Sequence, residues 1–588
     1  MKNFLKYVLA TITGILLTSI IFFIIMLAAL SAMVASGNKT SPISDNSILV
    51  LKAGTPVPDR GNDSPLAGID FINMTFTANP GLNEILKNIE KAEDDNKIKG
   101  ILIENGLLPS GWATTGEIRN ALKKFRGSGK FVISYSDYVL TQECYYLSTA
   151  ADKIYINPGS MINFKGLSSE IVFFKNALEK LGVEVQVTRH GKFKGAVEPF
   201  ILDKLSEENK AQIKDYVGSI WNHVIESISE SRDITAEKLN LIADDLSGNI
   251  AKTALANNLI DGLMYRDVLI DTLKSLSGIE KEKELNLVSM TRYARTPDNK
   301  KNSSKTKIAV VYASGNIVMG KGNDSNIGAN AYAEIIRKQR IDSNVKAIVL
   351  RVNSPGGSAI ASDIIWRELE LTAKVKPVVV SMGNYAASGG YFISAPASKI
   401  YASPATISGS IGVFGLVPNA GKLMEQKLGL STETVNTNKN SDFPSIIRPM
   451  NDFEKGIMQA SVEEVYSDFV SKVATGRKMT AELVDSIGQG RVWSGTSALK
   501  IGLVDEIGGL NDAIKAAAGL AELETWSLRE LPAIEDPYTR LLSQLSGGVK
   551  MNILKRELGE KVKYYNLIQE IKNFSGIQAR LPYFLEIQ

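Results

Sequence analysis

The feature that most constrains this fold is an internal duplication. The segment DDNKIKGILIE at 94–104 resembles DSNVKAIVLR at 342–351, and KFVISYSDY at 130–138 resembles KPVVVSMGNY at 376–385. Aligned residues such as Gly100 and Ala347 are 247 positions apart, and other matches occur at nearly the same offset. Several separated matches at one offset indicate two copies of one structural unit.

The duplication predicts how the chain is divided. A connection rich in Pro, Asn, Ser and Lys separates the two copies, as is usual for an exposed linker. The final segment has no evident counterpart in the first copy. We therefore expect a cytoplasmic start and membrane anchor at 1–45, the first copy at 46–290, a linker at 291–307, the second copy at 308–522 and a C-terminal tail at 523–588.

Each copy alternates apolar runs with helical periodicity. Runs such as KIAVVYASG, VKAIVLRVN and PVVVSMG are short, rich in Val and bounded by turn residues, which is typical of buried strands. The segments between them place apolar residues at helical spacing. This order predicts an α/β fold of βαβ units around a parallel sheet. A longer amphipathic helix is expected at 452–477, with its counterpart at 204–232.

The N-terminus has the sequence of a membrane anchor. No charged residue occurs between Tyr7 and Asn38, and this apolar stretch exceeds the roughly 20 residues that span a bilayer. The apolar region of a cleavable signal peptide is shorter. Lys2 and Lys6 favour a cytoplasmic N-terminus, which would place the remaining chain across the membrane. The alternative is a long signal peptide cut near the sequence ASG.

The composition excludes several kinds of site. The single cysteine, Cys144, allows no intrachain disulfide and no cysteine-built metal site. Only two histidines are present, which disfavours a histidine-rich metal site. The net charge of +4 is small for 588 residues and gives no indication of nucleic-acid binding.

The first candidate site is the stretch NYAASGGYF around Ser388. It predicts a strand, a tight turn and a helix that begins near this serine. A hydroxyl at a helix start lies in positive potential, which stabilises a developing alkoxide. A serine that only caps the helix is the structural alternative. The first copy has Thr141 at this place and no glycine pair after it, which favours a function specific to the second copy.

A second candidate is the glycine turn in RVNSPGGSAIASD. Gly356 and Gly357 follow a strand and precede a helix, so their amides can face a ligand without side-chain obstruction. Such amides suit an oxyanion hole. A simple strand-to-helix turn is the alternative. The first copy has Pro109 and Ser110 at these positions, so the shared fold does not require two glycines.

A third candidate is Lys194 in VTRHGKFKGAVEPF of the first copy. The second copy has Ser441 at the matching position, so each copy lacks what the other has. A lysine can act as the base for a serine if burial lowers its pKa, and neighbouring cations lower it further. His190 and His223 leave a histidine-based arrangement open.

The motifs NSPGG, NYAASGGY, SGSIGVFG and FKGAVEPF resemble the long, duplicated form of the protease IV, or signal peptide peptidase A, family. The resemblance implies an α/β fold of two tandem crotonase/Clp-protease-like repeats of the ββα type, behind an N-terminal transmembrane helix. It also implies a Ser-Lys dyad in which Ser388 is the nucleophile and Lys194 the general base. In this reading Ser410 orients the lysine, and Gly357, Gly389 and Gly356 supply the oxyanion hole.

The resemblance further implies the biological setting. It predicts a serine endopeptidase that needs no cofactor or metal and that hydrolyses remnant signal peptides and other apolar peptides. A homotetramer in the cytoplasmic (inner) membrane is implied, single-pass, with its catalytic region on the exported, periplasmic side. No nucleic-acid partner is expected. Two alternatives remain at this point: crotonase-type chemistry on acyl-CoA, and a catalytically decayed membrane scaffold.

Overall fold

The computed structural model places most of the chain. The described residues are 2–37, 42–54, 56–61, 69–70, 75–76, 80–106, 110–297, 304–323, 325–533 and 576–581. Most of the expected tail at 523–588, part of the linker and residues 38–41 behind the expected anchor therefore lie outside the described residues.

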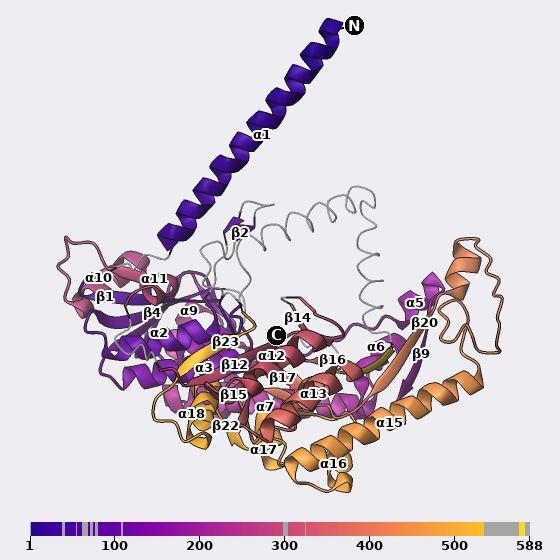
Figure 1. Cartoon of the computed structure of the whole chain (residues 1–588). Coiled ribbons are helices and arrows are strands. Elements are labelled where there is room, and N and C mark those ends of the chain that lie inside the picture. The colour runs from indigo at the N-terminus through magenta and orange to yellow at the C-terminus, as the bar shows by residue number, and fades with distance from the viewer. Residues whose placement is uncertain are drawn as a thin grey trace.

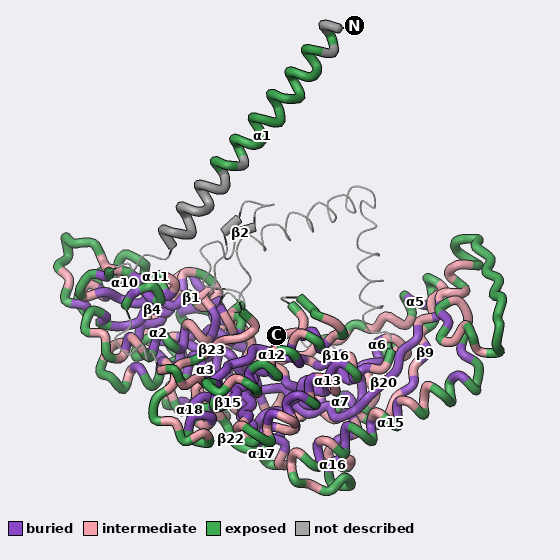
Figure 2. Tube along the Cα trace, in the orientation of Figure 1, coloured by how far each residue is buried: buried purple, intermediate pink, exposed green. Residues whose placement is uncertain are grey.

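The first helix, α1 (Lys2–Gly37), projects away from the rest of the molecule (Figure 1). Its described side chains are exposed (Figure 2). Over the residues described, no helix combines the length and the apolar character needed to cross a membrane. The membrane anchor therefore stays a prediction.

The first copy is built on a parallel sheet with the strand order β10-β7-β5-β4-β1-β11. Helices surround it, and the small strands β2, β3, β6 and β8 form two-stranded additions. The strands are β1 (Ser47–Ala53), β2 (Ile69–Asp70), β3 (Thr75–Phe76), β4 (Ile98–Asn105), β5 (Phe131–Ser136), β6 (Val139–Leu140), β7 (Lys153–Ile156), β8 (Met161–Ile162), β10 (Gly262–Leu263) and β11 (Leu287–Ser289). The helices are α2 (Leu82–Asp94), α3 (Trp112–Arg126), α4 (Gln142–Ser148), α5 (Lys175–Leu181), α6 (Glu198–Ile201), α7 (Glu207–Arg232), α8 (Ala236–Asp244), α9 (Ala251–Ala256), α10 (Arg266–Ser277) and α11 (Met290–Ala294).

The second copy repeats this arrangement. Its sheet runs β21-β19-β17-β15-β12-β23, with β18 paired to β17 and β22 paired to β18. The strands are β12 (Lys307–Ser314), β15 (Val345–Ser354), β17 (Val378–Ala387), β18 (Lys399–Ala402), β19 (Ile407–Gly409), β21 (Val492–Ser494), β22 (Glu506–Ile507) and β23 (Ser527–Leu531). The helices are α12 (Ala329–Ile341), α13 (Ala359–Ala373), α14 (Gly389–Ser394), α15 (Asp452–Arg477), α16 (Ala481–Ile487), α17 (Gly495–Lys500) and α18 (Leu510–Leu520).

The order β22-β18-β17-β15-β12-β23 matches the whole first sheet strand for strand. Helix α15 has the predicted bounds, and α7 is its counterpart of equal length. The sequence did not predict β23, which lies in the expected tail and takes the place that β11 has in the first copy. The expected tail therefore contains one strand with a counterpart in the first copy, because β23 pairs with β12 as β11 pairs with β1.

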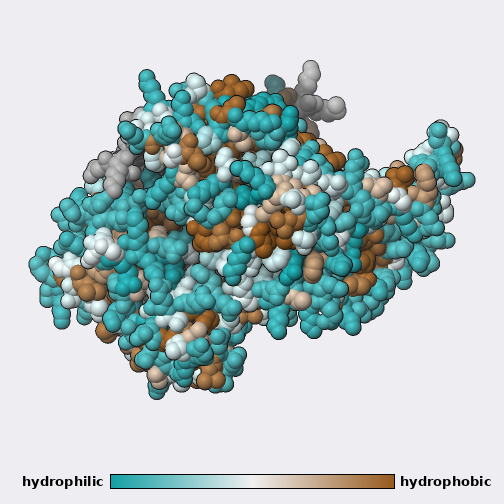
Figure 3. All heavy atoms as spheres, turned by 90° about the horizontal axis from the view of Figure 1, so that it is seen from below, coloured by the Kyte–Doolittle hydropathy of each residue, from teal (hydrophilic) through white to brown (hydrophobic). Residues whose placement is uncertain are grey.

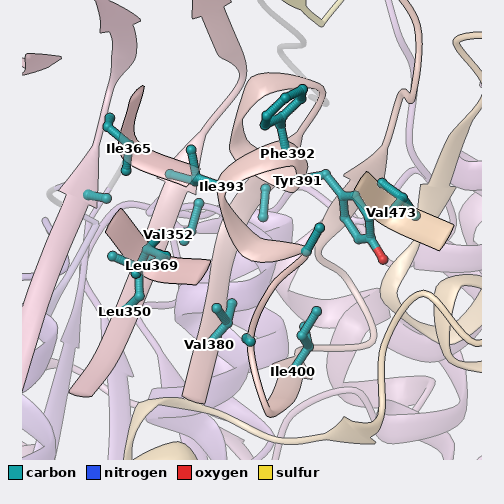
Figure 4. Close-up of a cluster of buried hydrophobic side chains, with 14 of the residues drawn as sticks. Leu350, Val352, Ile365, Leu369, Val380, Tyr391, Phe392, Ile393, Ile400 and Val473 are labelled. Atoms are coloured by element: carbon teal, nitrogen blue, oxygen red, sulfur yellow. The ribbon is translucent and has the colours of Figure 1, made fainter. Parts of the chain in front are cut away.

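The core of the second copy lies between its sheet and the covering helices. Leu350 and Val352 of β15 and Val380 of β17 face Ile365 and Leu369 of α13 (Figure 4). All of these side chains are fully buried. Seen from below, the surface is mostly hydrophilic with separate apolar patches (Figure 3), as is normal for a folded protein.

A third sheet joins the two copies, with the order β14-β13-β16-β24-β20-β9. Only β9 comes from the first copy, and it pairs antiparallel with β20 from Arg189 opposite Phe414 to Glu184 opposite Asn419. The strands are β9 (Glu184–Arg189), β13 (Asn316–Val318), β14 (Asn326–Gly328), β16 (Gly356–Ser358), β20 (Phe414–Asn419) and β24 (Gly576–Arg580).

A buried ion cluster also holds the copies together. Arg351 of β15 pairs with Asp59 and with Glu117 of α3, each at 2.7 Å, and all three side chains are buried. Burial alone would lower the pKa of Arg351, but the two carboxylates outweigh it and raise that pKa. Asn384 adds to this contact, because its side-chain oxygen accepts hydrogen bonds from the Ala113 and Thr114 amides in the first turn of α3.

Candidate active site

Ser388 stands at the sharp turn that the sequence predicted. Strand β17 ends at Ala387 and α14 begins at Gly389, so the serine is the residue that precedes the helix. Its φ of 55° is uncommon for a residue with a Cβ and indicates a strained turn. The Ser388 amide donates to the Gly409 carbonyl at 2.8 Å, which fixes this turn. Its side chain makes no capping hydrogen bond to α14.

The Ser388 hydroxyl meets Lys194 instead. The Lys194 Nζ lies 2.8 Å from Ser388 Oγ, 3.0 Å from Ser410 Oγ and 3.2 Å from the Ser410 carbonyl oxygen. All three residues are fully buried. The fold thus joins one residue of the first copy and two of the second, although Lys194 and Ser388 are 194 positions apart in the sequence.

Burial lowers the pKa of Lys194 well below its usual value. The sequence also led us to expect a contribution from neighbouring cations, but burial is the cause that the structure gives. A neutral amine has two N–H groups and one lone pair. Two N–H groups match the two oxygens of Ser410, and the lone pair then faces the Ser388 hydroxyl. The geometry therefore fits an unprotonated amine that accepts a proton from the serine.

Lys194 reaches this position through contacts between the copies. After β9 pairs with β20, the amide of His190 donates to Val413 and that of Phe193 to Gln489. Gln212 of α7 then bridges the copies, because its amide group donates to the Phe193 carbonyl and accepts from the Val492 amide. The loop that ends at Lys194 is thus held against the second copy at several points.

Two glycines make room for the lysine stem. A Cβ on Gly490 would lie 2.7 Å from the Lys194 backbone, and φ at this residue is 83°. A Cβ on Gly412 would lie 3.2 Å from Lys194 Cδ. Both glycines belong to the second copy. Their close approach explains why the segments SGSIGVFG and GQGRVW are rich in glycine.

Sequence reasoning missed a buried polar cluster behind the lysine. Glu198 is fully buried and accepts hydrogen bonds from Ser206 and from the side-chain amide of Asn209, each side-chain contact at 2.6 Å. Gly195 packs directly on Asn209, since a Cβ there would lie 2.6 Å from its Oδ1. The available signal was the sequence KGAVEPF, in which glycine and glutamate flank an apolar pair directly after Lys194.

Neither histidine contacts Ser388 in the described part of the chain. His190 pairs with Glu463 of α15 at 2.5 Å and stacks on Tyr466. His223 lies against the hydroxyl of Tyr146, and burial together with Arg119 lowers the pKa of His223 to about 4. The basic side chain that reaches the serine is therefore Lys194.

The expected oxyanion glycines lie beside Ser388, but they are not equivalent. The Gly356 amide donates to Ser354 Oγ at 3.1 Å, so this amide is already occupied, contrary to the expectation that it supplies the hole. Gly357 follows it in β16, and Gly389 begins α14. These two residues remain as candidate donors.

In the first copy, the backbone amide at the position equivalent to Gly357 has a hydrogen-bond acceptor. Ser110, 247 positions before Gly357, donates its amide to the buried carboxylate of Glu143 at 2.8 Å. Burial raises the pKa of Glu143, and hydrogen bonds from Thr115 and the backbone oppose this. An amide at this point of the repeat therefore binds a carboxylate oxygen within the same chain. Pro109, the other position compared, lies outside the described residues.

The described side chains contain no group of three or more His, Cys, Asp or Glu residues arranged to hold a metal ion. The polar atoms around Ser388 are hydroxyls, backbone groups and one amine. Such a set can perform acyl transfer, because it contains a nucleophile, a base and amides for an oxyanion.

Comparison with known protein families finds the same family in both copies. The model of peptidase family S49 matches residues 124–280 and 370–524, and the Clp protease model matches 299–407. The chain is 35% identical to Protease 4 of Haemophilus influenzae over 85% of this chain and 83% of that protein. It is 32% identical to the chloroplastic serine protease SPPA of Arabidopsis thaliana over 87% and 76%. A ClpP1 structure from Listeria monocytogenes aligns with a TM-score of 0.24 and 16% identity, covering 35% of this chain and 94% of that chain.

Proposed function

We propose, from the premise that this chain belongs to peptidase family S49 and is a serine protease, that it cleaves peptides with a Ser388–Lys194 dyad. The observation that supports this most directly is the 2.8 Å contact between Lys194 Nζ and Ser388 Oγ in a fully buried site. Family membership favours the peptidase over the acyl-CoA and scaffold alternatives.

In the proposed mechanism, neutral Lys194 accepts the Ser388 proton as Oγ attacks the scissile carbonyl carbon. The C–N bond then breaks, and Lys194 gives that proton to the leaving amine. A water molecule next gives a proton to Lys194 and attacks the acyl-enzyme, and the proton returns to Ser388 Oγ. Ser410 orients the amine through its hydroxyl and carbonyl oxygens. Burial serves this cycle because it lowers the pKa of Lys194 and so favours the neutral amine that the serine proton needs.

The oxyanion is assigned to the amides of Gly357 and Gly389. The assignment of Gly357 is supported by the first copy, where the equivalent Ser110 amide donates a hydrogen bond to a carboxylate oxygen of Glu143. Gly389 follows the nucleophile directly at a helix start, where backbone amides have no acceptor within the helix. Gly356 is left out, because its amide is bonded to Ser354.

The proposed substrates are remnant signal peptides and other apolar peptides. We propose that α1 anchors the chain in the cytoplasmic membrane as a single pass, with both copies on the exported, periplasmic side. The support is the uncharged sequence from Tyr7 to Asn38 behind two lysines. Extraction at high pH from cells would leave an anchored chain in the membrane pellet, whereas a chain released into the wash would contradict the anchor.

A homotetramer is also proposed. The segment between β20 and α15 has several exposed apolar side chains, at Leu428, Leu430, Val435 and Ile446, and large exposed apolar surfaces are typical of protein contacts. Light scattering on the detergent-solubilised chain measures its mass, and a monomer at micromolar concentration would contradict the assembly.

The dyad is tested on the full-length chain with a fluorogenic peptide that carries Ala or Leu at P1. We expect background activity for Ser388→Ala and Lys194→Ala, and substantial activity for His190→Ala. Lys192→Ala is the matched control, because Lys192 is an exposed lysine of the same loop. Activity in Lys194→Ala together with its loss in His190→Ala would refute the lysine assignment.

A further inference from the structure

A short turn of the second copy contacts both sides of the proposed base. It comprises residues 488–491, between α16, which ends at Ile487, and β21, which begins at Val492. We call these residues the linking turn. Gln489 and Gly490 within it have φ values of 50° and 83°. A positive φ is uncommon for glutamine, so the linking turn needs contacts outside itself to keep this conformation.

One side of the linking turn holds the loop that ends at Lys194. The Gln489 carbonyl accepts a 3.0 Å hydrogen bond from the Phe193 amide. Gly490 lies so close to the lysine that a Cβ there would be 2.7 Å from the Lys194 backbone. The guanidinium of Arg491 lies over the Phe193 ring, 5.2 Å from the ring centroid. The linking turn therefore contacts both the lysine and the residue that precedes it.

The other side of the linking turn holds the loop of Ser410. The Ser410 amide donates to the Arg491 carbonyl, and the Gly490 amide donates to the Ile411 carbonyl, each at 2.7 Å. Ser410 has a φ of 51°, so its loop also needs outside contacts. Because Lys194 and Ser410 are both held by the linking turn, the position of this turn sets the distance between the amine and the oxygens that orient it.

Tyr466 of α15 holds the linking turn in place. Its hydroxyl accepts a 3.2 Å hydrogen bond from the Gln489 amide and donates a 2.5 Å hydrogen bond to Asp485 Oδ1 in α16. The Tyr466 ring stacks on His190, with the ring centroids 3.7 Å apart. Helix α15 packs against α16, β9 and β20 (Figure 1). Tyr466 is thus bonded to the linking turn and also contacts the loop that leads to the lysine.

The surroundings of the Tyr466 hydroxyl keep it protonated. Burial and the carboxylates of Asp485 and Glu463 raise the pKa of Tyr466, and the hydrogen bond from the Gln489 amide only partly opposes this. Glu463 lies three residues earlier in α15 and pairs with His190. The hydroxyl therefore gives its proton to the bond with Asp485, and its oxygen is left to accept from Gln489. Packing alone would be served equally well by phenylalanine.

We propose that Tyr466 is a positioning residue for the proposed dyad: its hydroxyl fixes the linking turn, and the linking turn fixes Lys194 against Ser410. This inference rests on the proposed function and goes beyond it. Tyr466 acts through other residues, because in the described part of the chain it makes no hydrogen bond to Lys194 or Ser388. Without the hydroxyl, the Gln489 amide loses its acceptor and the linking turn is less restrained. A lysine that is less well placed transfers the proton more slowly.

Steady-state kinetics of full-length Tyr466→Phe on the fluorogenic peptide, measured across the pH range, tests this role. The substitution keeps the ring that stacks on His190 and removes only the hydroxyl. We expect kcat to fall about tenfold and KM to change less than about twofold, because the base is affected and not the binding of the peptide. The acid limb of the pH profile should move to higher pH. A looser loop admits water to Lys194, which weakens the effect of burial on the lysine pKa.

Tyr145→Phe is the matched control. Tyr145 is fully buried, and its hydroxyl donates to the Leu259 carbonyl within the first copy at 2.9 Å. Both substitutions remove a hydrogen bond of a buried tyrosine, so Tm should fall in both variants. Only Tyr466→Phe should change kcat and the acid limb. An unchanged kcat in Tyr466→Phe, an equal fall of kcat in both variants, or an acid limb that stays in place would overturn the positioning role.

Two further variants separate this result from the proposed dyad. Lys194→Ala and Ser388→Ala are assayed on the same peptide. If both are inactive while Tyr466→Phe has the kcat of the unmodified chain, the dyad stands and the positioning role is wrong. Activity in Lys194→Ala would refute the proposed dyad, and the positioning role would fall with it.

Discussion

Replacing Ser410 by Ala removes one of three contacts to the proposed base. The Ser410 hydroxyl lies 3.0 Å from Lys194 Nζ, whereas the Ser410 carbonyl contact at 3.2 Å comes from the backbone and remains. The lysine then keeps its contact with Ser388 but has one N–H group without its acceptor. We expect a weaker enzyme with an intact fold, because Ser410 is fully buried and alanine is smaller than serine.

The size of the effect follows from the value of one hydrogen bond. A typical intramolecular hydrogen bond contributes a net ~0.5–1.5 kcal/mol, and about 1.4 kcal/mol corresponds to a tenfold change in rate. The plateau of kcat/KM should therefore fall about 2- to 10-fold. The Ser410 hydroxyl also binds an ammonium more strongly than an amine. Its loss should lower the pKa of Lys194 further and shift the acid limb of the pH profile to lower pH.

The assay is kcat/KM on a fluorogenic peptide across the pH range, for the unmodified chain, Ser410→Ala and Ser408→Ala. Ser408 is the matched control, because it is equally buried and its hydroxyl bonds the Ala386 carbonyl and not the lysine. An unchanged plateau in Ser410→Ala would refute the orienting role. An acid limb that moves to higher pH would refute the reasoning about the lysine charge.

Three further substitutions test the charge of Lys194, the space around its side chain and the ion cluster between the copies. Lys194→Met should abolish activity and raise Tm near neutral pH. Because the pKa of Lys194 is lowered on folding, the unmodified chain gains stability as the pH rises from the folded pKa toward about 10.4. The difference in Tm between the variant and the unmodified chain should therefore narrow over that pH range. A gap that widens with pH would contradict a buried neutral amine. Gly490→Ala should displace the lysine and reduce kcat about 10- to 100-fold, and steady-state kinetics with unchanged kcat would show that the loop can yield. Arg351→Met leaves two buried carboxylates without their cation and should lower the free energy of unfolding by urea by roughly 3–5 kcal/mol. A loss below about 1 kcal/mol, the level of an exposed ion pair, would indicate that protonation of the carboxylates costs little free energy.

The duplication made much of the fold predictable from the sequence. It identified the two sheets and the paired helices α7 and α15, because repeated strands carry repeated patterns of Val and Ile. It also showed that Ser388 and Lys194 occur in opposite copies. The sequence could not show that the two side chains meet, since that contact depends on the pairing of β9 with β20 across the copies.

The parts that escaped prediction depend on distant partners. Strands β23 and β24 are short, and each is stabilised by edges that other segments supply. Asn209 and Gln212 lie on a helix where polar side chains are ordinarily solvated, and contacts with the loop of Lys194, with Glu198 and with Val492 of the second copy make them internal. Gly356 was expected to donate to an oxyanion, but the nearby Ser354 hydroxyl takes its amide.

The two residues of the proposed dyad lie in different copies, and this has a consequence for biosynthesis. The ribosome makes Lys194 first and Ser388 much later, and the β20 strand that holds the lysine loop in place comes later still. A growing chain therefore carries half of the chemistry until both copies have emerged and docked. A nascent chain that still lacks Ser388 is therefore expected to be unable to cut itself or its neighbours through the proposed dyad.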